Sequence, residues 1–219
     1  MEFLKSIRDR SQHYQVPFEH WEFQQPLTDA CVDEINRRQI ENPKELGMNY
    51  DGTRAIDGGE GFFRDGIVSG GQALPYRCFV QASNSKDYPH MVNLINELKS
   101  KDTYGYIGEL LKKDLTNSYI RIEIICDRPG FWLKPHCDIK EKLLSCLVFT
   151  NPYYEAEYLG TDLYDKNLNK VKTIPYKNNS GYFFSSNENS WHGCEKKVIK
   201  IERRAVQINY VTFKTDWKV

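Results

Sequence analysis

Three side chains in the C-terminal half of the chain could together hold a metal ion: His136, Asp138 and His192. His136 and Asp138 stand two residues apart in a strand-like segment, where such side chains point to the same side. His192 follows 56 residues later, just past another expected strand. Two imidazoles and one carboxylate on one face of a metal leave its opposite face open, which suits non-haem Fe(II). A Zn(II) enzyme could use the same ligands with a bound water as nucleophile.

The sequence also holds a decoy with related chemistry. His20 and Glu22 flank a tryptophan near the N-terminus, in the same one-residue spacing. We expect this segment to lie outside the strands that carry the other histidines, so we do not assign it to the metal site.

Two adjacent arginines, Arg203 and Arg204, open an expected strand shortly after His192. Because side chains alternate along a strand, the two arginines belong to opposite faces. The face of Arg204 is otherwise apolar and should pack against helices; it continues with Val206, Ile208 and Tyr210. The face of Arg203 is polar and should line a pocket; it continues with Ala205, Gln207 and Asn209. An arginine on a pocket wall offers a bidentate, permanently charged partner to a carboxylate. A pair of solvated arginines on an edge strand is the alternative.

The elements that must position these residues change in character near residue 117. Before it, apolar residues follow helical spacing in three segments. The first begins at Thr28 or Asp29, the second ends near Lys101, and the third is a short segment before Asp114. After it the period becomes two, and turn signals separate short strands. We place these strands at residues 120–124, 143–149, 157–164, 171–174, 181–185 and 203–213. Helices followed by regularly spaced strands indicate an α+β fold, most simply closed as a double-sheet jelly roll.

Between the expected helices lies an irregular stretch, Gly47 to Gly71, which holds eight of the fourteen glycines. A long glycine-rich segment inside a compact domain is typical of a binding loop or lid. We expect Tyr50, Arg54 and Arg64 of this loop to contact the substrate, together with Trp191 beside the distal histidine. A passive surface loop is the alternative.

Composition bounds the class of protein. The 219 residues carry 30 basic and 30 acidic side chains, so the net charge gives no support to a nucleic-acid or membrane surface. No apolar window approaches the length of a transmembrane helix. Six scattered cysteines without a Cys-x-x-Cys pair suit a reducing compartment. We expect a single cytoplasmic domain over residues 1–219, with no membrane and no nucleic-acid partner.

Several motifs together resemble the Fe(II)/2-oxoglutarate-dependent dioxygenases, and within them the prolyl-4-hydroxylase-type branch. The core of the resemblance is His136-x-Asp138, Trp191-His192-Gly193 and an arginine about ten residues beyond. Arg128-Pro129-Gly130 before the first histidine, the segment from Tyr158 to Tyr164, and Gly181-Tyr182-Phe183-Phe184 before the second add to it. The resemblance covers roughly residues 118–213.

The resemblance implies a double-stranded β-helix (jelly roll, cupin-like) core at 118–213, with helical support and a substrate loop at 1–117. His136, Asp138 and His192 would be the catalytic Fe(II) ligands. The cosubstrate 2-oxoglutarate would place its far carboxylate on Arg203, with Arg204 as the fallback, and Gln207 would approach it on the same strand face. Phe149 departs from the branch, which often has a tyrosine there.

The implied activity is hydroxylation of an unactivated C–H bond with O2, releasing succinate and CO2. An amino acid, a peptidyl residue and a small metabolite all remain open as substrate, as does the oligomeric state. Asp138 argues against a halogenase, and Asn209 and Tyr210 stand where a nucleic-acid demethylase would carry a second arginine. A catalytically inactive jelly-roll binding module, or a metal-dependent enzyme that does not use 2-oxoglutarate, is the alternative.

Overall fold

The computed structural model describes residues 1–40 and 76–219. The expected loop from Gly47 to Gly71, with Tyr50, Arg54 and Arg64, lies outside the described residues.

Three of the helices in the described residues lie where the apolar spacing of the sequence predicts them. Their bounds are α1 Glu2–Asp9, α2 Asp29–Asn36, α3 Pro89–Leu98 and α4 Lys101–Leu111, with 3₁₀ turns η1 Ser85–Asp87 and η2 Glu157–Leu159. Thr28 and Ser100 cap α2 and α4, because each hydroxyl accepts a hydrogen bond from the backbone N–H three residues on, at 3.2 and 3.4 Å. Lys112 ends α4 in the left-handed conformation, with φ of 54°. The expected helices are confirmed, and α1 is an addition.

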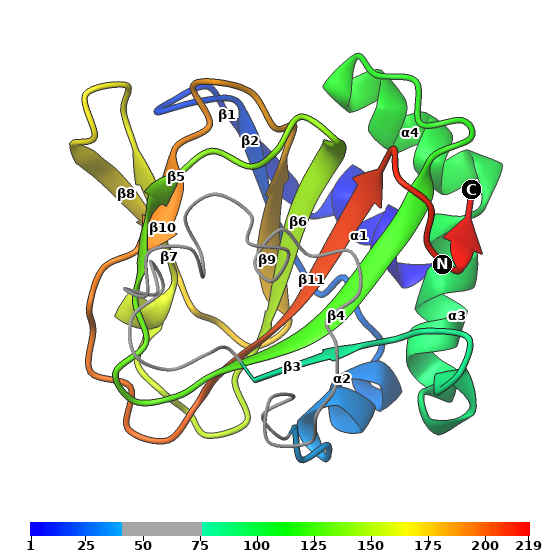
Figure 1. The fold of residues 1–219 in the computed structure, drawn as a ribbon, viewed down its shortest axis with the longest axis horizontal. Helices are drawn as coiled ribbons and strands as arrows, with labels where there is room; N and C mark the ends of the chain where they lie inside the picture. Colours follow the sequence, from blue (N-terminus) through cyan, green and yellow to red (C-terminus); the bar gives the residue numbers. More distant parts are fainter. Residues whose placement is uncertain (41–75) are drawn as a thin grey trace.

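The larger of two antiparallel sheets has its strands in the order β1-β2-β9-β6-β11-β4-β12, with β3 also paired to β4 (Figure 1). The bounds are β1 Ser11–Tyr14, β2 His20–Gln24, β3 Tyr76–Phe79, β4 Tyr119–Asp127, β6 Lys142–Thr150, β9 Ser180–Phe184, β11 Arg203–Val211 and β12 Trp217–Lys218. The long strands β4, β6 and β11 form its centre.

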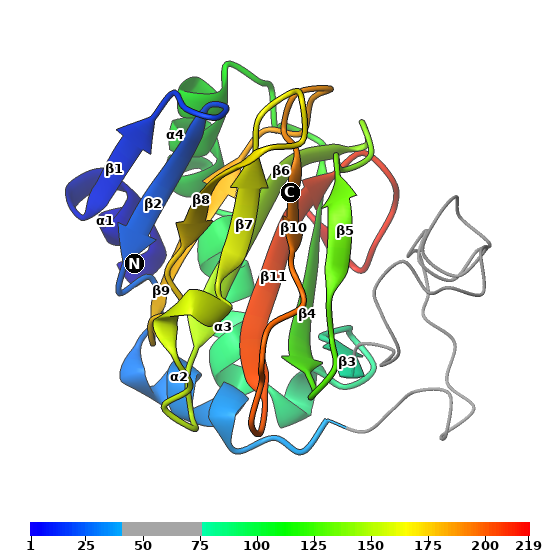
Figure 2. The same ribbon diagram turned by 90° about the vertical axis from the view of Figure 1, so that its left-hand side faces the viewer.

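The smaller sheet has the order β5-β10-β7-β8 and lies in front of the larger sheet in Figure 2. Its strands are β5 Leu133–His136, β7 Thr161–Tyr164, β8 Lys170–Ile174 and β10 His192–Cys194. Side chains of both sheets share one apolar cluster, in which Phe149 and Ala205 of the larger sheet meet Leu163 and Ile174 of the smaller. The two sheets therefore pack face to face around a core.

The helices cover the other face of the larger sheet. Ile122 and Ile124 of β4 and Ile208 of β11 share a second core cluster with Ile95 and Leu98 of α3. The alternation along β11 is confirmed, because Val206, Ile208 and Tyr210 join this helix-facing cluster while Ala205 joins the cluster between the sheets. We call these two sides the outer face and the inner face of the larger sheet.

Helices dominate before residue 117, as expected, but three strands that were not expected lie there as well. β1 and β2 extend the larger sheet beyond β9, and β3 pairs with β4. These strands have four or five residues, too few to show a clear period, and their pairing comes from strands distant in sequence. His20 and Glu22, expected outside the strands, therefore lie within β2.

Three further boundaries differ from the expected ones. The expected strand at 157–164 begins with the turn η2 and becomes a strand only at Thr161. The short strands β10 and β12 were not expected, because two or three residues give no periodic signal. No helix of the described residues is long and apolar enough to cross a membrane.

Candidate metal centre

The pairing of β5 with β10 brings the two distant histidines together. His136 ends β5 and His192 begins β10, and the two are directly opposite each other in the register. Their ring centroids are 4.4 Å apart. Asp138 follows β5 by two residues, and one ligand atom from each of the three residues lies within 4.8 Å of the others. Within residues 1–40 and 76–219 this is the one such group of three that could hold a metal ion.

Both imidazoles present the same nitrogen to the centre. Nδ1 of His136 donates to the backbone carbonyl of Lys134 at 2.9 Å, and Nδ1 of His192 donates to that of Ser190 at 3.0 Å. Because a carbonyl only accepts, the proton of each neutral ring sits on Nδ1 and the lone pair on Nε2. Such a bond to the second nitrogen orients a metal-ligating histidine.

The carboxylate of Asp138 is held from two sides. Lys142 Nζ donates to Oδ1 at 2.6 Å, and Ser145 Oγ donates to Oδ2 at 2.5 Å. The same Oδ2 lies 3.7 Å from Nε2 of His192. A carboxylate offers about four lone-pair positions, so an oxygen that accepts one hydrogen bond still has one for a metal.

The protonation states of the three residues suit a cation. Burial opposes the charged form of Asp138, yet Lys142 and the two imidazoles outweigh it and hold the pKa of the carboxyl well below its usual range. Burial, together with the neighbouring His136, lowers the pKa of His192 to about 4. Burial also lowers the pKa of His136. Near neutral pH the centre therefore offers two neutral imidazoles and one carboxylate, and this donor set fits Fe(II).

Arg203 lies on the inner face, as the strand alternation predicts, but it already has partners. Its Nη1 donates to Asp127 at 2.5 Å, its Nε to the carbonyl of Leu159 at 2.5 Å, and its Nη2 to Thr161 at 3.1 Å. The ring of Phe149 lies 5.2 Å from the guanidinium carbon. Burial raises the pKa of Asp127, while Arg203 opposes that shift.

Arg204 points the other way. Its guanidinium pairs with Glu202 and donates to the carbonyls of Ile35 and Asn36 at the end of α2, at 2.7 and 3.0 Å. The two arginines are adjacent in sequence, and consecutive side chains leave a strand on opposite faces. Arg204 thus ties the sheet to a helix.

The remaining expected site residues are placed as follows. Gln207 is half-buried on the inner face, opposite Glu123 of β4 and Leu147 of β6. Trp191 is half-buried and directly precedes His192, and its carbonyl accepts a hydrogen bond from the backbone N–H of Tyr164 at 2.9 Å.

Sequence reasoning missed the side chains that support these residues. Lys142, Ser145 and Asp127 hold Asp138 and Arg203, and none of them was singled out. The i,i+4 spacing of Asp138 and Lys142 was a visible signal for the first pair. Asp127 gave no signal, because its partner lies 76 residues away.

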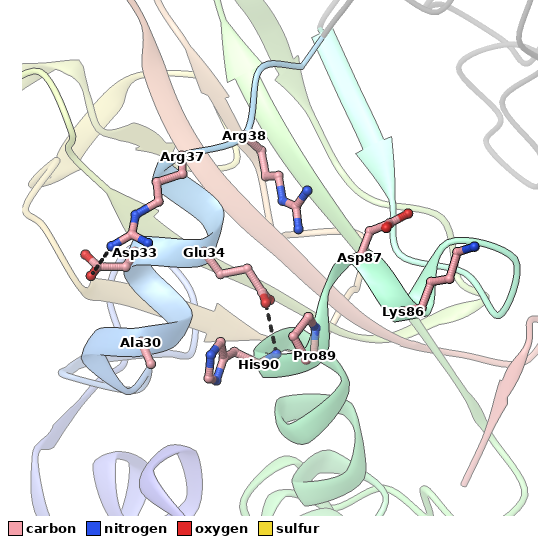
Figure 3. Close-up of a pocket in the computed structure, with 9 residues that line it drawn as sticks. All are labelled: Ala30, Asp33, Glu34, Arg37, Arg38, Lys86, Asp87, Pro89 and His90. Carbon is pink, nitrogen blue, oxygen red and sulfur yellow. Dashed lines mark hydrogen bonds and ion pairs between the residues drawn. The ribbon is translucent and has the colours of Figure 1, made fainter.

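An open pocket of about 610 Å³ lies apart from this centre, between α2 and the start of α3 (Figure 3). Two of its carboxylates already have partners within the fold. Glu34 accepts hydrogen bonds from the backbone N–H groups of His90 and Met91, at 3.1 and 2.9 Å, and so caps α3. Asp33 pairs with Arg37 one turn along α2. None of the three candidate metal ligands lines this pocket.

Comparison with solved structures identifies the fold. A prolyl-4-hydroxylase from Pseudomonas putida superposes with a TM-score of 0.59 at 8% identity, over 96% of this chain and 97% of that one. A prolyl hydroxylase from Trichoplax adhaerens, solved with a peptide fragment of the hypoxia inducible factor oxygen degradation domain, gives 0.51 at 14% identity, over 96% and 88%. A prolyl 4-hydroxylase from Phytophthora capsici gives 0.50 at 15% identity, over 64% of this chain and 49% of that one.

No family model matches the sequence, and no curated protein matches it. At these identities the structural likeness shows a shared fold. The chain therefore has the fold of prolyl-4-hydroxylases, with mixed helices and mostly antiparallel sheets, and carries a His-Asp-His group within it.

Proposed function

We propose that this protein is an Fe(II)- and 2-oxoglutarate-dependent dioxygenase that hydroxylates an unactivated C–H bond. The two sheets would form the jelly-roll core of a single domain. One observation carries the proposal: the ligand atoms of His136, Asp138 and His192 lie within 4.8 Å of one another, at the paired ends of β5 and β10. The shared fold with prolyl-4-hydroxylases supports it.

The protein's own residues would hold the metal with ligands of fixed orientation. The two Nε2 lone pairs and one oxygen of Asp138 would occupy one side of the ion. The hydrogen bonds to Nδ1 keep each ring from turning, and Lys142 and Ser145 keep the carboxylate in place. When bound, Fe(II) with 2-oxoglutarate and dioxygen supplies the oxidising power for hydroxylation, with release of succinate and CO2.

Arg203 is the proposed partner of the far carboxylate of 2-oxoglutarate. It lies on the inner face among apolar side chains, where a charge-assisted hydrogen bond is strong. Its ion pair with Asp127 leaves further N–H groups for a second carboxylate, because a guanidinium carries five. Gln207, two residues further toward the metal centre than Ala205, would contact the middle of the cosubstrate. Phe149 has no hydroxyl to add to these contacts.

The direct test adds Fe(II) and then 2-oxoglutarate to the metal-free protein without oxygen and records the visible spectrum. We expect a weak metal-to-ligand charge-transfer band, which His136→Ala abolishes. Arg203→Ala should raise the 2-oxoglutarate concentration needed for half of the band by tenfold or more. Arg204→Ala, which changes the same charge on the opposite strand face, is the matched control and should change that concentration little.

Each outcome separates the candidate functions. A folded protein that binds Fe(II) but gives no band with 2-oxoglutarate would be a metal-dependent enzyme of another kind. A folded protein that binds no Fe(II) would be a jelly-roll binding module. Succinate release, followed with amino acids, peptides and small metabolites, then identifies the substrate.

A further inference from the structure

Three charged side chains form a cluster on the inner face of the larger sheet. The buried carboxylate of Glu123 accepts a hydrogen bond from Arg121 Nη2 at 2.7 Å and one from Arg77 Nη1 at 3.3 Å. The side chains of Arg121 and Arg77 are 9% and 13% exposed. Because two cations share one anion, this Arg77–Glu123–Arg121 cluster carries one positive charge in excess.

The strand register places Arg121 in one row with a residue that supports the candidate metal centre, two strands away. Arg121 of β4 lies opposite Asn209 of β11, which lies opposite Ser145 of β6. Neighbouring strands are about 4.8 Å apart, so these residues form one row on one face. Ser145 donates to Asp138, the candidate metal ligand. Charge–charge interactions also link Asp138 to Arg121 and His136 to Arg77.

Each of the two arginines has one buried side-chain N–H group without a hydrogen-bond partner in the part of the chain that the structure describes. Among the described residues, Nε of Arg77 and Nε of Arg121 are buried and have no hydrogen-bond partner. The ring of Phe79 lies 5.0 Å from the guanidinium carbon of Arg121 and limits its movement. A buried donor without a partner costs free energy, and an anionic oxygen group that bound here would remove that cost.

The charges of the loaded site leave this cluster unbalanced. Lys142 balances Asp138, and Arg203 balances Asp127. The two positive charges of Fe(II) would balance the two negative charges of 2-oxoglutarate. Within residues 1–40 and 76–219, the excess charge of the Arg77–Glu123–Arg121 cluster then remains for a further anion.

We propose that Arg121 and Arg77 bind an anionic oxygen group of the prime substrate, a carboxylate or a phosphate, and so orient its C–H bond at the metal centre. This inference rests on the proposed function, and it names the substrate class: a small anionic metabolite. The arginines act as specificity-determining residues, because a neutral analogue would leave their charge unpaired.

The test uses Mn(II) in place of Fe(II) and N-oxalylglycine in place of 2-oxoglutarate. Bound Mn(II) broadens the NMR signals of nuclei held near it, so the probes are inorganic phosphate, read by ³¹P, and [1-¹³C]acetate, read by ¹³C. We expect broadening of at least one probe by the wild-type protein, and at least a fivefold smaller effect with Arg121→Gln or Arg77→Gln. Arg37→Gln, at the exposed residue that follows α2, makes the same charge change and should match the wild type.

Folding is controlled separately. Arg121→Gln leaves Glu123 with one partner, so the double variant Arg121→Gln/Glu123→Gln restores the single positive charge of the cluster without the Arg121 guanidinium. It should still show the loss of broadening, because the guanidinium itself contacts the anion. Circular dichroism checks that each variant is folded.

The probes distinguish the possible outcomes. Broadening of acetate alone identifies a carboxylate site, and broadening of phosphate alone identifies a phosphate site. Equal broadening in the wild type and Arg121→Gln, or none with either probe, overturns the inference. A tenfold weaker binding of N-oxalylglycine to Arg121→Gln also overturns it, because the arginine would then hold the cosubstrate. Failure of the wild type to bind Mn(II), read from the EPR signal of the free ion, refutes the proposed function itself.

Discussion

Along β4 and β11, the larger sheet presents two faces of opposite character. On the outer face, Ile122 and Ile208 pack against helices and are almost wholly buried. On the inner face the same strands carry Arg121, Glu123 and Arg203, which are buried as well but charged. The two faces come from alternate residues of the same segments, so they share a backbone and differ in what their side chains contact.

The two faces contribute differently to stability. A fully buried isoleucine stabilises a fold by about 1.5–3 kcal/mol relative to an exposed one. A buried ion pair is often no better than an apolar pair of similar volume, although breaking it is costly. The outer face therefore stabilises the fold through apolar burial alone, whereas on the inner face the loss of one partner of a buried ion pair is the costly change.

The sharpest test of this contrast is removal of Glu123. Glu123→Ala leaves Arg77 and Arg121 buried without their shared anion, and we expect a loss of about 3–5 kcal/mol in the free energy of unfolding. Urea denaturation followed by circular dichroism measures it. The double variant Glu123→Ala/Arg121→Ala should lose less than the sum of the single variants. A loss for Glu123→Ala below about 1 kcal/mol would mean that these charges behave as solvated surface pairs.

Acid should lower the free energy of unfolding of the metal-free protein through His192, which lies in the smaller sheet. Burial and His136 lower the pKa of His192 from 6.5 to about 4. Between these values the unfolded chain binds a proton that the folded chain does not, so stability falls as the pH falls from about 6.5 to 4, by up to about 3 kcal/mol. Asp138, whose pKa is lowered, stays ionised over this window.

Urea denaturation across that pH range measures the effect. His192→Gln should flatten the dependence, whereas His13→Gln, at an exposed site on β1, should leave it in place. If the free energy of unfolding of His192→Gln depends on pH as in the wild type, another group takes up the proton.

The Asp127–Arg203 pair tests whether an inner-face charge is shared with a ligand. Asp127→Asn removes the carboxylate beside Arg203 but keeps an oxygen that accepts from its Nη1. We expect 2-oxoglutarate to bind about fivefold more tightly, a gain of roughly 1 kcal/mol, because two carboxylates no longer compete for one guanidinium. Titration of the anaerobic charge-transfer band gives the dissociation constant. Weaker binding would show that Asp127 instead positions Arg203 for the cosubstrate.

The smallest effect is expected on the outer face. Ile122→Val removes one buried methylene beside the helices and should cost about 0.5–1.5 kcal/mol of stability. Binding of metal and of 2-oxoglutarate should not change, since the side chain faces away from both. Any change in their dissociation constants above twofold would mean that the two faces are not independent.

Much of the fold follows from local pattern. The apolar spacing of α3 and the alternation of β4 and β11 are visible in the sequence, because each element needs one apolar side to bury. The same alternation placed Arg203 and Arg204 on opposite faces. The short strands β1, β2, β3 and β10 had no such signal, because their hydrogen-bond partners lie far away along the chain.

The sequence by itself determined the residue types of the candidate metal centre and the strand face of Arg203, whereas Asp138 lies beyond the end of β5, where strand alternation no longer places it. Only the tertiary structure decided that His192 lies opposite His136, and that Asp127 holds Arg203. It alone assembled the Arg77–Glu123–Arg121 cluster from β3 and β4. The reason is physical: side-chain direction along one strand is a local property of the backbone, whereas pairing between distant strands depends on the packing of the whole fold.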